Sequence, residues 1–179
     1  MAAGLPEVWL ISGIPGAGKT PVARALAQSF EASAHVEGDR LAEGVVSGVV
    51  LPGDEPAEES QRQMELCIRN QCLLARSFAE AGFTPVLDYV VVTRHLLDAY
   101  RHYLAGGVLR FVTLAPPLEV ALERDRDRAA KSVGDRFAAL DALMREELAT
   151  AGLWLDNGAL SVEETVAAIL DGAGAALLA

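Results

Sequence analysis

The 179-residue sequence is poor in several residue types, and each shortage narrows its class. Two cysteines and three histidines, with no CxxC pair among them, exclude a disulfide framework and a zinc pattern. No apolar run approaches the ~20 residues of a membrane-spanning helix, and no basic leader precedes an apolar segment at the N-terminus. We therefore expect a cytoplasmic protein without membrane partners, in which Cys67 and Cys72 are buried thiols.

Acidic residues outnumber basic residues, and most of the basic residues are arginines. Lys and Arg total 15 against 25 Asp and Glu, which gives a formal net charge of −10. Such an acidic chain is a poor binder of the DNA or RNA backbone, so we expect a small-molecule partner and no nucleic acid. Only Lys19 and Lys131 are lysines, which makes the position of each informative.

Short apolar runs alternate with longer amphipathic segments, a pattern typical of an α/β fold with a parallel sheet. Strands are expected at residues 8–12, 34–37, 84–88, 109–114 and 153–155. Helices are expected at 19–31, 57–81, 93–105, 116–129, 137–149 and 161–170, and a Gly/Pro-rich loop at 44–56. Thr93 and Ser161 stand where helix N-caps are expected. The length fits one domain over residues 1–179, built as a three-layer α/β/α sandwich.

One motif defines the chemistry. Gly13-Ile14-Pro15-Gly16-Ala17-Gly18-Lys19-Thr20 follows the pattern GxxxxGK[ST] and joins the first expected strand to the first expected helix. Glycines allow the backbone to turn around phosphate oxygens, and the loop amides and the helix N-terminus attract the anion. Lys19 supplies a positive charge to the outer phosphates, and the Thr20 hydroxyl can bind Mg²⁺. The motif predicts a P-loop that binds a nucleotide with Mg²⁺.

Two details refine the nucleotide prediction. Pro21 follows Thr20, and proline fits the first turn of a helix but has no N–H to donate. In P-loop proteins this amide usually contacts the α-phosphate, so we expect a weaker hold on that group. The chain has no NKxD guanine motif, which favours ATP over GTP.

Two aspartates stand at expected strand ends, at the sheet edge that also carries the P-loop. Asp39 follows the second strand, where it would orient or deprotonate an acceptor hydroxyl or hold Mg²⁺ through water. The alternative is a helix N-cap. Asp88 ends the third strand and is expected to act with Thr20 on the metal, the alternative being a turn residue. Tyr89 follows it in place of the Glu of motor ATPases, which argues against a motor.

An arginine-rich segment at 124–136 reverses the charge of the chain locally, with five basic and three acidic residues. Arg124 and Arg128 are four residues apart and therefore share one helical face. We expect a lid that brings both arginines to the transferring phosphoryl group, with Gly134 as its hinge. The alternative is a solvated helix whose charges pair with one another.

The P-loop, the Gly38-Asp39 pair and the arginine-rich segment together resemble the small P-loop kinases, which include gluconate, shikimate and adenylylsulfate kinases. The likeness is greatest to the chloramphenicol-phosphotransferase-like and zeta-toxin-related group. This resemblance implies a five-stranded parallel sheet in the order 2-3-1-4-5 and Asp39 as the acceptor base. It also implies a base-binding loop at 156–160. Trp154, beside that loop, either packs in the hydrophobic core or serves as a platform for the adenine base.

The sequence therefore predicts an ATP-dependent phosphotransferase that moves the γ-phosphoryl of Mg-ATP to a hydroxyl of a small metabolite or antibiotic. The acceptor would lie between Asp39, the 44–56 loop and the end of the third strand, within reach of Arg40, Arg69 and Arg94. Two alternatives stay open. A nucleotide or nucleotide-sugar kinase would need a more basic acceptor pocket, and a regulatory domain that binds or hydrolyses ATP would not need Asp39.

Overall fold

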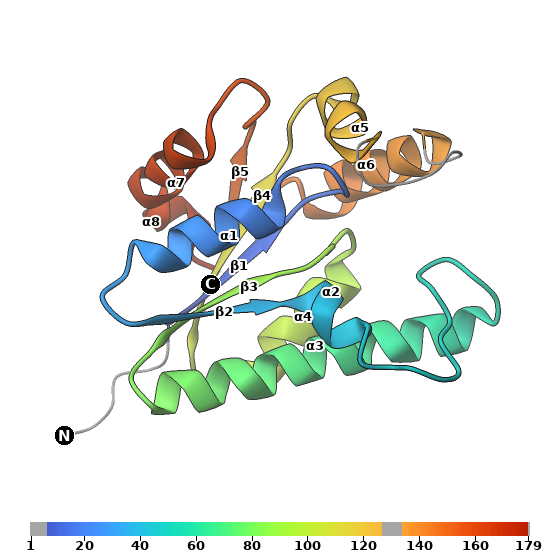
Figure 1. The fold of residues 1–179 in the computed structure, drawn as a ribbon, viewed down its shortest axis with the longest axis horizontal. Helices are drawn as coiled ribbons and strands as arrows, with labels where there is room; N and C mark the ends of the chain where they lie inside the picture. The colour runs from blue at the N-terminus through green and yellow to red at the C-terminus, as the bar shows by residue number, and fades with distance from the viewer. Residues whose placement is uncertain (1–6, 127–133, 179) are drawn as a thin grey trace.

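A five-stranded parallel sheet forms the centre of the molecule, in a computed structural model that describes residues 7–126 and 134–178 (Figure 1). Its strands are β1 (Glu7–Ser12), β2 (Ser33–Glu37), β3 (Thr84–Asp88), β4 (Val108–Leu114) and β5 (Leu153–Leu155). They are ordered β2-β3-β1-β4-β5, which confirms the expected class and the order 2-3-1-4-5. The central strand β1 is buried from its second residue onward, because both faces of the sheet are covered.

Helices cover both faces of the sheet (Figure 1). On one side lie α1 (Lys19–Gln28), α7 (Val162–Asp171) and α8 (Ala173–Ala176), and on the other lie α3 (Ala57–Glu80) and α4 (Arg94–Tyr103). The helices α5 (Leu118–Arg126) and α6 (Gly134–Leu148) lie between β4 and β5 in the chain. Large apolar side chains such as Leu10, Ile11 and Phe111 fill the interior. The result is the expected three-layer arrangement.

Cap residues begin two of these helices as expected. The Thr93 hydroxyl accepts a hydrogen bond from the Leu96 amide at the start of α4. Ser161 and Glu164 form a reciprocal capping box before α7, and hydrogen bonds from Ser161 lower the pKa of the Glu164 carboxyl. Each cap satisfies amides that the first helical turn leaves without partners, a contribution of about 1 kcal/mol.

Some boundaries and two short helices differ from expectation. The helix expected at 19–31 ends at Gln28, and the one expected at 116–129 begins at Leu118. The helices α2 (Gly38–Ala42) and α8 were not predicted, because elements of four or five residues are too short to show a helical repeat. The remaining strands and helices lie within a few residues of their predicted positions.

The Gly/Pro-rich stretch between α2 and α3 forms the expected loop, and α3 holds it in place. Gln63 bonds both the Val50 amide and the Gly48 carbonyl, and the Ser60 hydroxyl donates to the Leu51 carbonyl. Three apolar side chains of this loop, at Val46, Val49 and Leu51, are nevertheless exposed.

Cys67 and Cys72 are buried free thiols, as predicted. Within 7–126 and 134–178, the helices are too short or too polar to cross a bilayer.

Candidate active site

The P-loop joins β1 to α1 and is shaped by glycines. Gly16 has a φ of +78°, and a Cβ there would lie 2.0 Å from the backbone oxygen of Ala121 in α5. Only glycine fits a left-handed backbone pressed this closely against another segment. Lys19 opens α1 with 9% of its surface exposed, and its ammonium donates to the Ile14 carbonyl at 3.1 Å. The loop therefore curls around the lysine head group.

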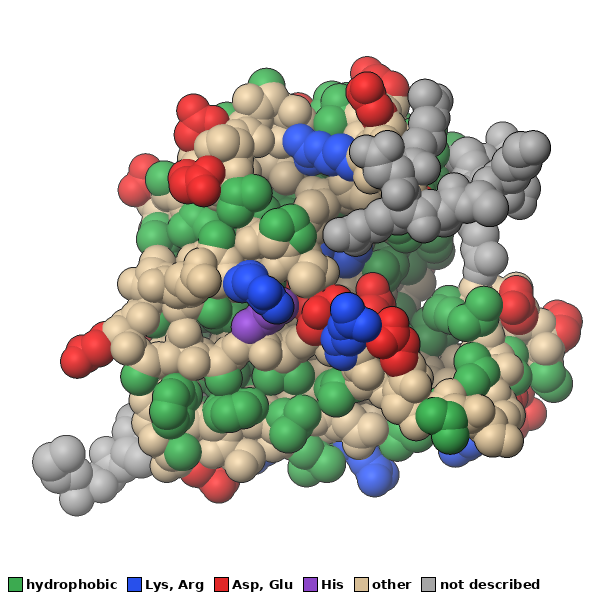
Figure 2. Space-filling view, in the orientation of Figure 1, with side chains coloured by type: hydrophobic (Ala, Val, Ile, Leu, Met, Phe, Trp, Pro, Cys, Tyr) green, Lys and Arg blue, Asp and Glu red, His purple; other side chains and the backbone are tan. Residues whose placement is uncertain are grey.

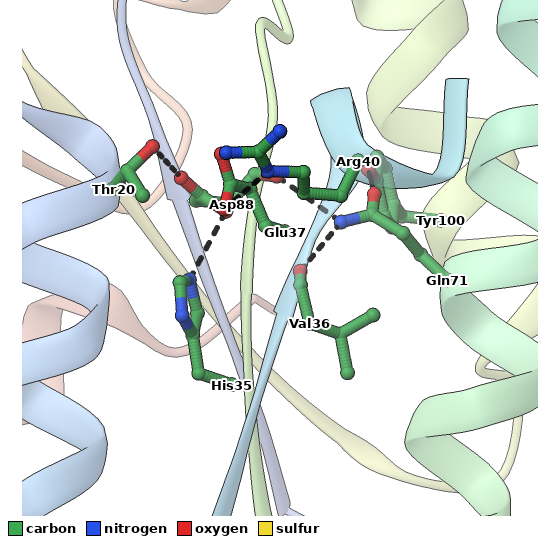
Figure 3. Close-up of polar contacts among 8 residues, drawn as sticks. All are labelled: Thr20, His35, Val36, Glu37, Arg40, Gln71, Asp88 and Tyr100. Atoms are coloured by element: carbon green, nitrogen blue, oxygen red, sulfur yellow. Dashed lines mark hydrogen bonds and ion pairs between the residues drawn. The ribbon is translucent and has the colours of Figure 1, made fainter. Parts of the chain in front are cut away.

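Thr20, in the first turn of α1, contacts Asp88 at the carboxyl end of β3. The Thr20 hydroxyl donates to Asp88 Oδ2 at 2.6 Å, and Asp88 is only 3% exposed (Figure 3). Because the hydroxyl hydrogen goes to the carboxylate, the lone pairs of Thr20 Oγ1 remain available to a cation. His35 on β2 contacts the other carboxylate oxygen, with 3.2 Å between Nε2 and Oδ1. No motif in the sequence distinguishes His35.

A buried network on the opposite face fixes the same strand ends. The Gln71 amide group of α3 donates to the backbone carbonyls of Val36 and Asp88, at 2.9 and 3.1 Å. Its oxygen accepts the hydroxyl of Tyr100 from α4, and both side chains are fully buried (Figure 3). One side chain thus ties the ends of β2 and β3 together beneath the site.

Asp39 is held by the short helix α2. Glu37 occupies the N-cap without a side-chain cap bond, so Asp39 is the second helical residue and not the cap. The turn is tight because a Cβ at Gly38 would lie 2.4 Å from the Tyr89 ring. The Cys67 thiol donates to the Gly38 carbonyl at 3.2 Å, and burial raises the pKa of this thiol to about 11, which keeps its proton. The Asp39 side chain is exposed at the mouth of the site.

Arg124, at the end of α5, contacts the loop before α7. One of its guanidinium nitrogens donates to the carbonyls of Asn157 and Gly158, at 3.2 and 3.3 Å. Asn157 in turn donates from Nδ2 to the Ala17 carbonyl of the P-loop at 3.0 Å. The 156–160 loop, which the resemblance places at the nucleotide base, is therefore hydrogen-bonded to both the P-loop and α5. Arg128 and the central part of the expected lid lie outside the described residues.

Trp154 packs against the core. Its indole N–H donates to the Leu148 carbonyl at 2.9 Å, and the Arg145 guanidinium lies over its ring at 5.8 Å. These contacts agree with the first of its two interpretations.

A cavity of about 450 Å³ brings the P-loop together with Asp39 and Arg124. It is lined by Pro15, Gly16, Gly18, Lys19, Thr20, Pro21, Asp39, Val90, Arg124 and Asp125. Val90 and Asp125 were not predicted, since nothing in the local sequence distinguishes them from other strand-end and helix-surface residues. Asp88, which contacts Thr20, is not among the lining residues.

The three arginines expected at the acceptor do not line this cavity. Arg40 is exposed and pairs with Glu37 and Glu43, at 3.8 and 3.0 Å. Figure 2 shows acidic and basic side chains gathered on this face where α2 lies. Arg94 contacts Glu147 of α6 through its amide and its guanidinium, and Arg69 is exposed on α3.

The parallel sheet, the glycine-rich loop and the Thr20–Asp88 pair define a P-loop nucleotide-binding domain. Residues 8–152 match the AAA domain family AAA_33, and the chain belongs to that family. A comparison with curated protein sequences finds no match.

Solved structures with the same fold include several kinases. The tunicamycin resistance protein of Deinococcus radiodurans is 22% identical, with a TM-score of 0.70 over 98% of this chain and 99% of that one. A sugar kinase from Janibacter sp. HTCC2649 is 20% identical, with a TM-score of 0.67 over 96% of each chain. Shikimate kinase from Acinetobacter baumannii is 21% identical, with a TM-score of 0.62 over 94% and 93%. The fold is thus that of the small P-loop kinases.

Proposed function

We propose that the protein is a small-molecule kinase, which transfers the γ-phosphoryl group of Mg-ATP to a hydroxyl of its acceptor. The observation that carries this proposal is the composition of the 450 Å³ cavity. Lys19 and Thr20 line it from the P-loop, Arg124 from α5, and Asp39 from α2. A phosphate site and a carboxylate on one cavity are the minimum that phosphoryl transfer to a hydroxyl requires.

The residues present fit Mg²⁺. This ion prefers oxygen ligands and keeps several waters, so it needs only one or two protein groups beside the nucleotide phosphates. Thr20 offers a hydroxyl whose hydrogen is already donated, and Asp88 offers a buried carboxylate 2.6 Å from it. When bound there, Mg²⁺ would neutralise charge on the phosphate oxygens.

Each of the other residues would have a distinct task. The P-loop amides and Lys19 would bind the phosphates, and Asp39 would orient the acceptor hydroxyl and accept its proton. Arg124 reaches the cavity from the helix that leads into the expected lid, where its charge would face the transferring group. Arg128 is proposed for the same task from its place in the sequence alone.

The two alternatives are less well supported. A nucleotide kinase must neutralise an anionic acceptor, yet Arg40 is engaged by two glutamates and Arg94 by Glu147. Among the described residues, the cations on the cavity are Lys19 and Arg124, which belong to the phosphate side. A purely regulatory ATPase would not need the Asp39 carboxylate on the cavity that holds its P-loop. We therefore favour an acceptor without a phosphate group.

The test is a mass-spectrometric screen of the protein with Mg-ATP and a panel of sugars, shikimate, nucleosides, nucleotide sugars and hydroxyl-bearing antibiotics. Lys19→Ala is the inactive control. Once a product is found, Asp39→Asn is compared with Asp125→Asn, because both carboxylates line the same cavity. We expect Asp39→Asn to lower kcat at least ~100-fold while ATP affinity stays within about two-fold. Asp125→Asn should lower kcat far less.

Two results would contradict the proposal. ATP turnover without any phosphorylated product would favour the regulatory alternative. Full transfer by Asp39→Asn would remove Asp39 from the reaction, even if the kinase activity itself were found.

A further inference from the structure

We propose that His35 is a positioning residue, which holds the Asp88 carboxylate in the orientation that the magnesium site requires. The proposal rests on the proposed use of Mg-nucleotide. Its basis is one contact that the P-loop motif does not include. The His35 ring nitrogen Nε2 lies 3.2 Å from Asp88 Oδ1, while Thr20 donates to Oδ2 of the same carboxylate (Figure 3). Each carboxylate oxygen therefore has its own donor, one from α1 and one from β2.

Sheet geometry explains how a residue on an edge strand reaches this carboxylate. Glu37 of β2 is paired in register with Asp88 of β3, so His35 stands two residues earlier on the neighbouring strand. Side chains two apart point to the same face of a sheet. His35 thus points to the same face of the sheet as Asp88, the face that α1 covers with Thr20. Val36, the next residue of β2, points to the other face and packs into the core.

The contact is shielded from solvent, because the side chains of His35 and Asp88 are 12% and 4% exposed. An ionised carboxylate can only accept hydrogen bonds, so His35 donates through Nε2. With Thr20 alone, the carboxylate would be held at one oxygen and free to turn about its Cβ–Cγ bond. The Gln71 bond fixes the backbone carbonyl of Asp88 and not its side chain. His35 is therefore the contact that sets the rotation of the carboxylate plane.

A merely structural histidine would make a different prediction from a positioning one. Loss of a structural contact lowers stability and leaves the magnesium dependence of nucleotide binding unchanged. Loss of a positioning contact weakens the part of ATP affinity that Mg²⁺ adds and leaves binding in EDTA unchanged. The ratio of the two affinities separates these roles without any turnover measurement.

The experiment measures ATP affinity by calorimetry with excess Mg²⁺ and with EDTA. The variants are His35→Leu, which fills the space without a donor, and His35→Gln, which keeps a donor. His102→Ala is the matched control, because His102 is an exposed histidine of α4 in ring contact with Tyr103. Thermal unfolding of every variant establishes that it is folded, and His35→Ala serves as a second donor-free variant should His35→Leu not fold.

We expect His35→Leu to reduce the Mg²⁺-dependent gain in affinity about ten-fold. His35→Gln should recover most of that gain, and His102→Ala should match the wild type. Equal Mg²⁺-dependent gains in the wild type and the donor-free variants would overturn the role of His35 while leaving the proposed kinase intact. Absence of ATP binding by the wild type, in contrast, would overturn the proposed function and this inference with it.

Discussion

The phosphate end of the cavity and its proposed acceptor end are built differently. At the phosphate end, Lys19, Thr20 and Asp88 are held by hydrogen bonds within the described structure, and Asp88 is almost fully buried. At the proposed acceptor end, Asp39 lines the cavity from a five-residue helix and is exposed. The adjoining loop presents apolar side chains to solvent, with Val46 at 92% exposure.

This difference separates the buried residues that stabilise the fold from the exposed residues that are available to determine acceptor specificity. Substitutions of exposed residues usually change stability by less than about 0.5 kcal/mol, whereas disruption of a buried polar network costs several times more. The proposed acceptor end can therefore vary without loss of the phosphate machinery. Substitutions at the two ends test whether they differ in this way.

The largest effect is expected from Gly16→Ala. The new methyl group would meet the Ala121 carbonyl and displace the loop from α5. A hydrogen bond to a charged group contributes about 1.5–3 kcal/mol, so the loss of one or two loop amides from the phosphates should lower ATP affinity on the order of 100-fold. Gly48→Ala is the control, since Gly48 has a similar φ of +73° with nothing within 4 Å of an added Cβ. Similar ATP affinities for the two variants would contradict the role of this close contact.

The next effect is expected from Gln71→Leu, which removes the buried network under the strand ends. It leaves the carbonyls of Val36 and Asp88 and the Tyr100 hydroxyl without this partner. Each such loss costs about 1–3 kcal/mol, and we expect a net destabilisation of about 2–4 kcal/mol in denaturant unfolding. Gln61→Ala, at an exposed glutamine of the same helix, should change stability by less than about 0.5 kcal/mol. An equally small effect of Gln71→Leu would mean that β2 and β3 are held by their own pairing.

Pro21→Ala is expected to strengthen ATP binding, by a smaller factor than Gly16→Ala weakens it. This change restores an amide beside the phosphates in a residue that lines the cavity. One added hydrogen bond contributes about 0.5–1.5 kcal/mol, so ATP should bind two- to ten-fold more tightly in a calorimetric titration. Unchanged or weaker binding would show that this position does not contact the nucleotide.

The smallest effects are expected from Arg69→Ala and Arg94→Ala, at two residues that the sequence analysis placed within reach of the acceptor. Neither side chain lines the cavity, and the Arg94 contacts with Glu147 are exposed. We expect the KM for the acceptor to stay within about two-fold and stability to change by less than ~1 kcal/mol. A ten-fold rise in KM would instead extend the acceptor site over α3 or α4.

The sequence was most informative where structure depends on neighbours in the chain. The apolar runs predicted the strands, and the spacing of Gly16, Gly18, Lys19 and Thr20 predicted the phosphate loop. The sheet order followed from the resemblance to small kinases, and the structure confirms it. Asp88 was proposed for the metal because it ends a buried strand, and the structure places its carboxylate in contact with the Thr20 hydroxyl.

What the sequence did not reveal depends on contacts between distant segments. His35 acquires its partner only through the register of β2 with β3, 53 residues away in the chain. Asn157 reaches the P-loop across 140 residues. Sequence position alone suggests Arg40, Arg69 and Arg94 for the acceptor, but ion pairs and helix orientation decide where such side chains point. Local sequence patterns carry no information on ion pairs or on helix orientation.

The position of Lys19 has a practical consequence for chemical labelling. The sequence contains one other lysine, Lys131, so the chain presents very few primary amines. The Lys19 amine lies inside the phosphate loop, where 9% of the residue surface is exposed. A nucleotide carrying an acylating group on its phosphate tail would deliver the reagent to that amine, and the mass of one peptide would then report occupancy of the site. Compounds that compete for the nucleotide could be ranked by how far they suppress this single modification.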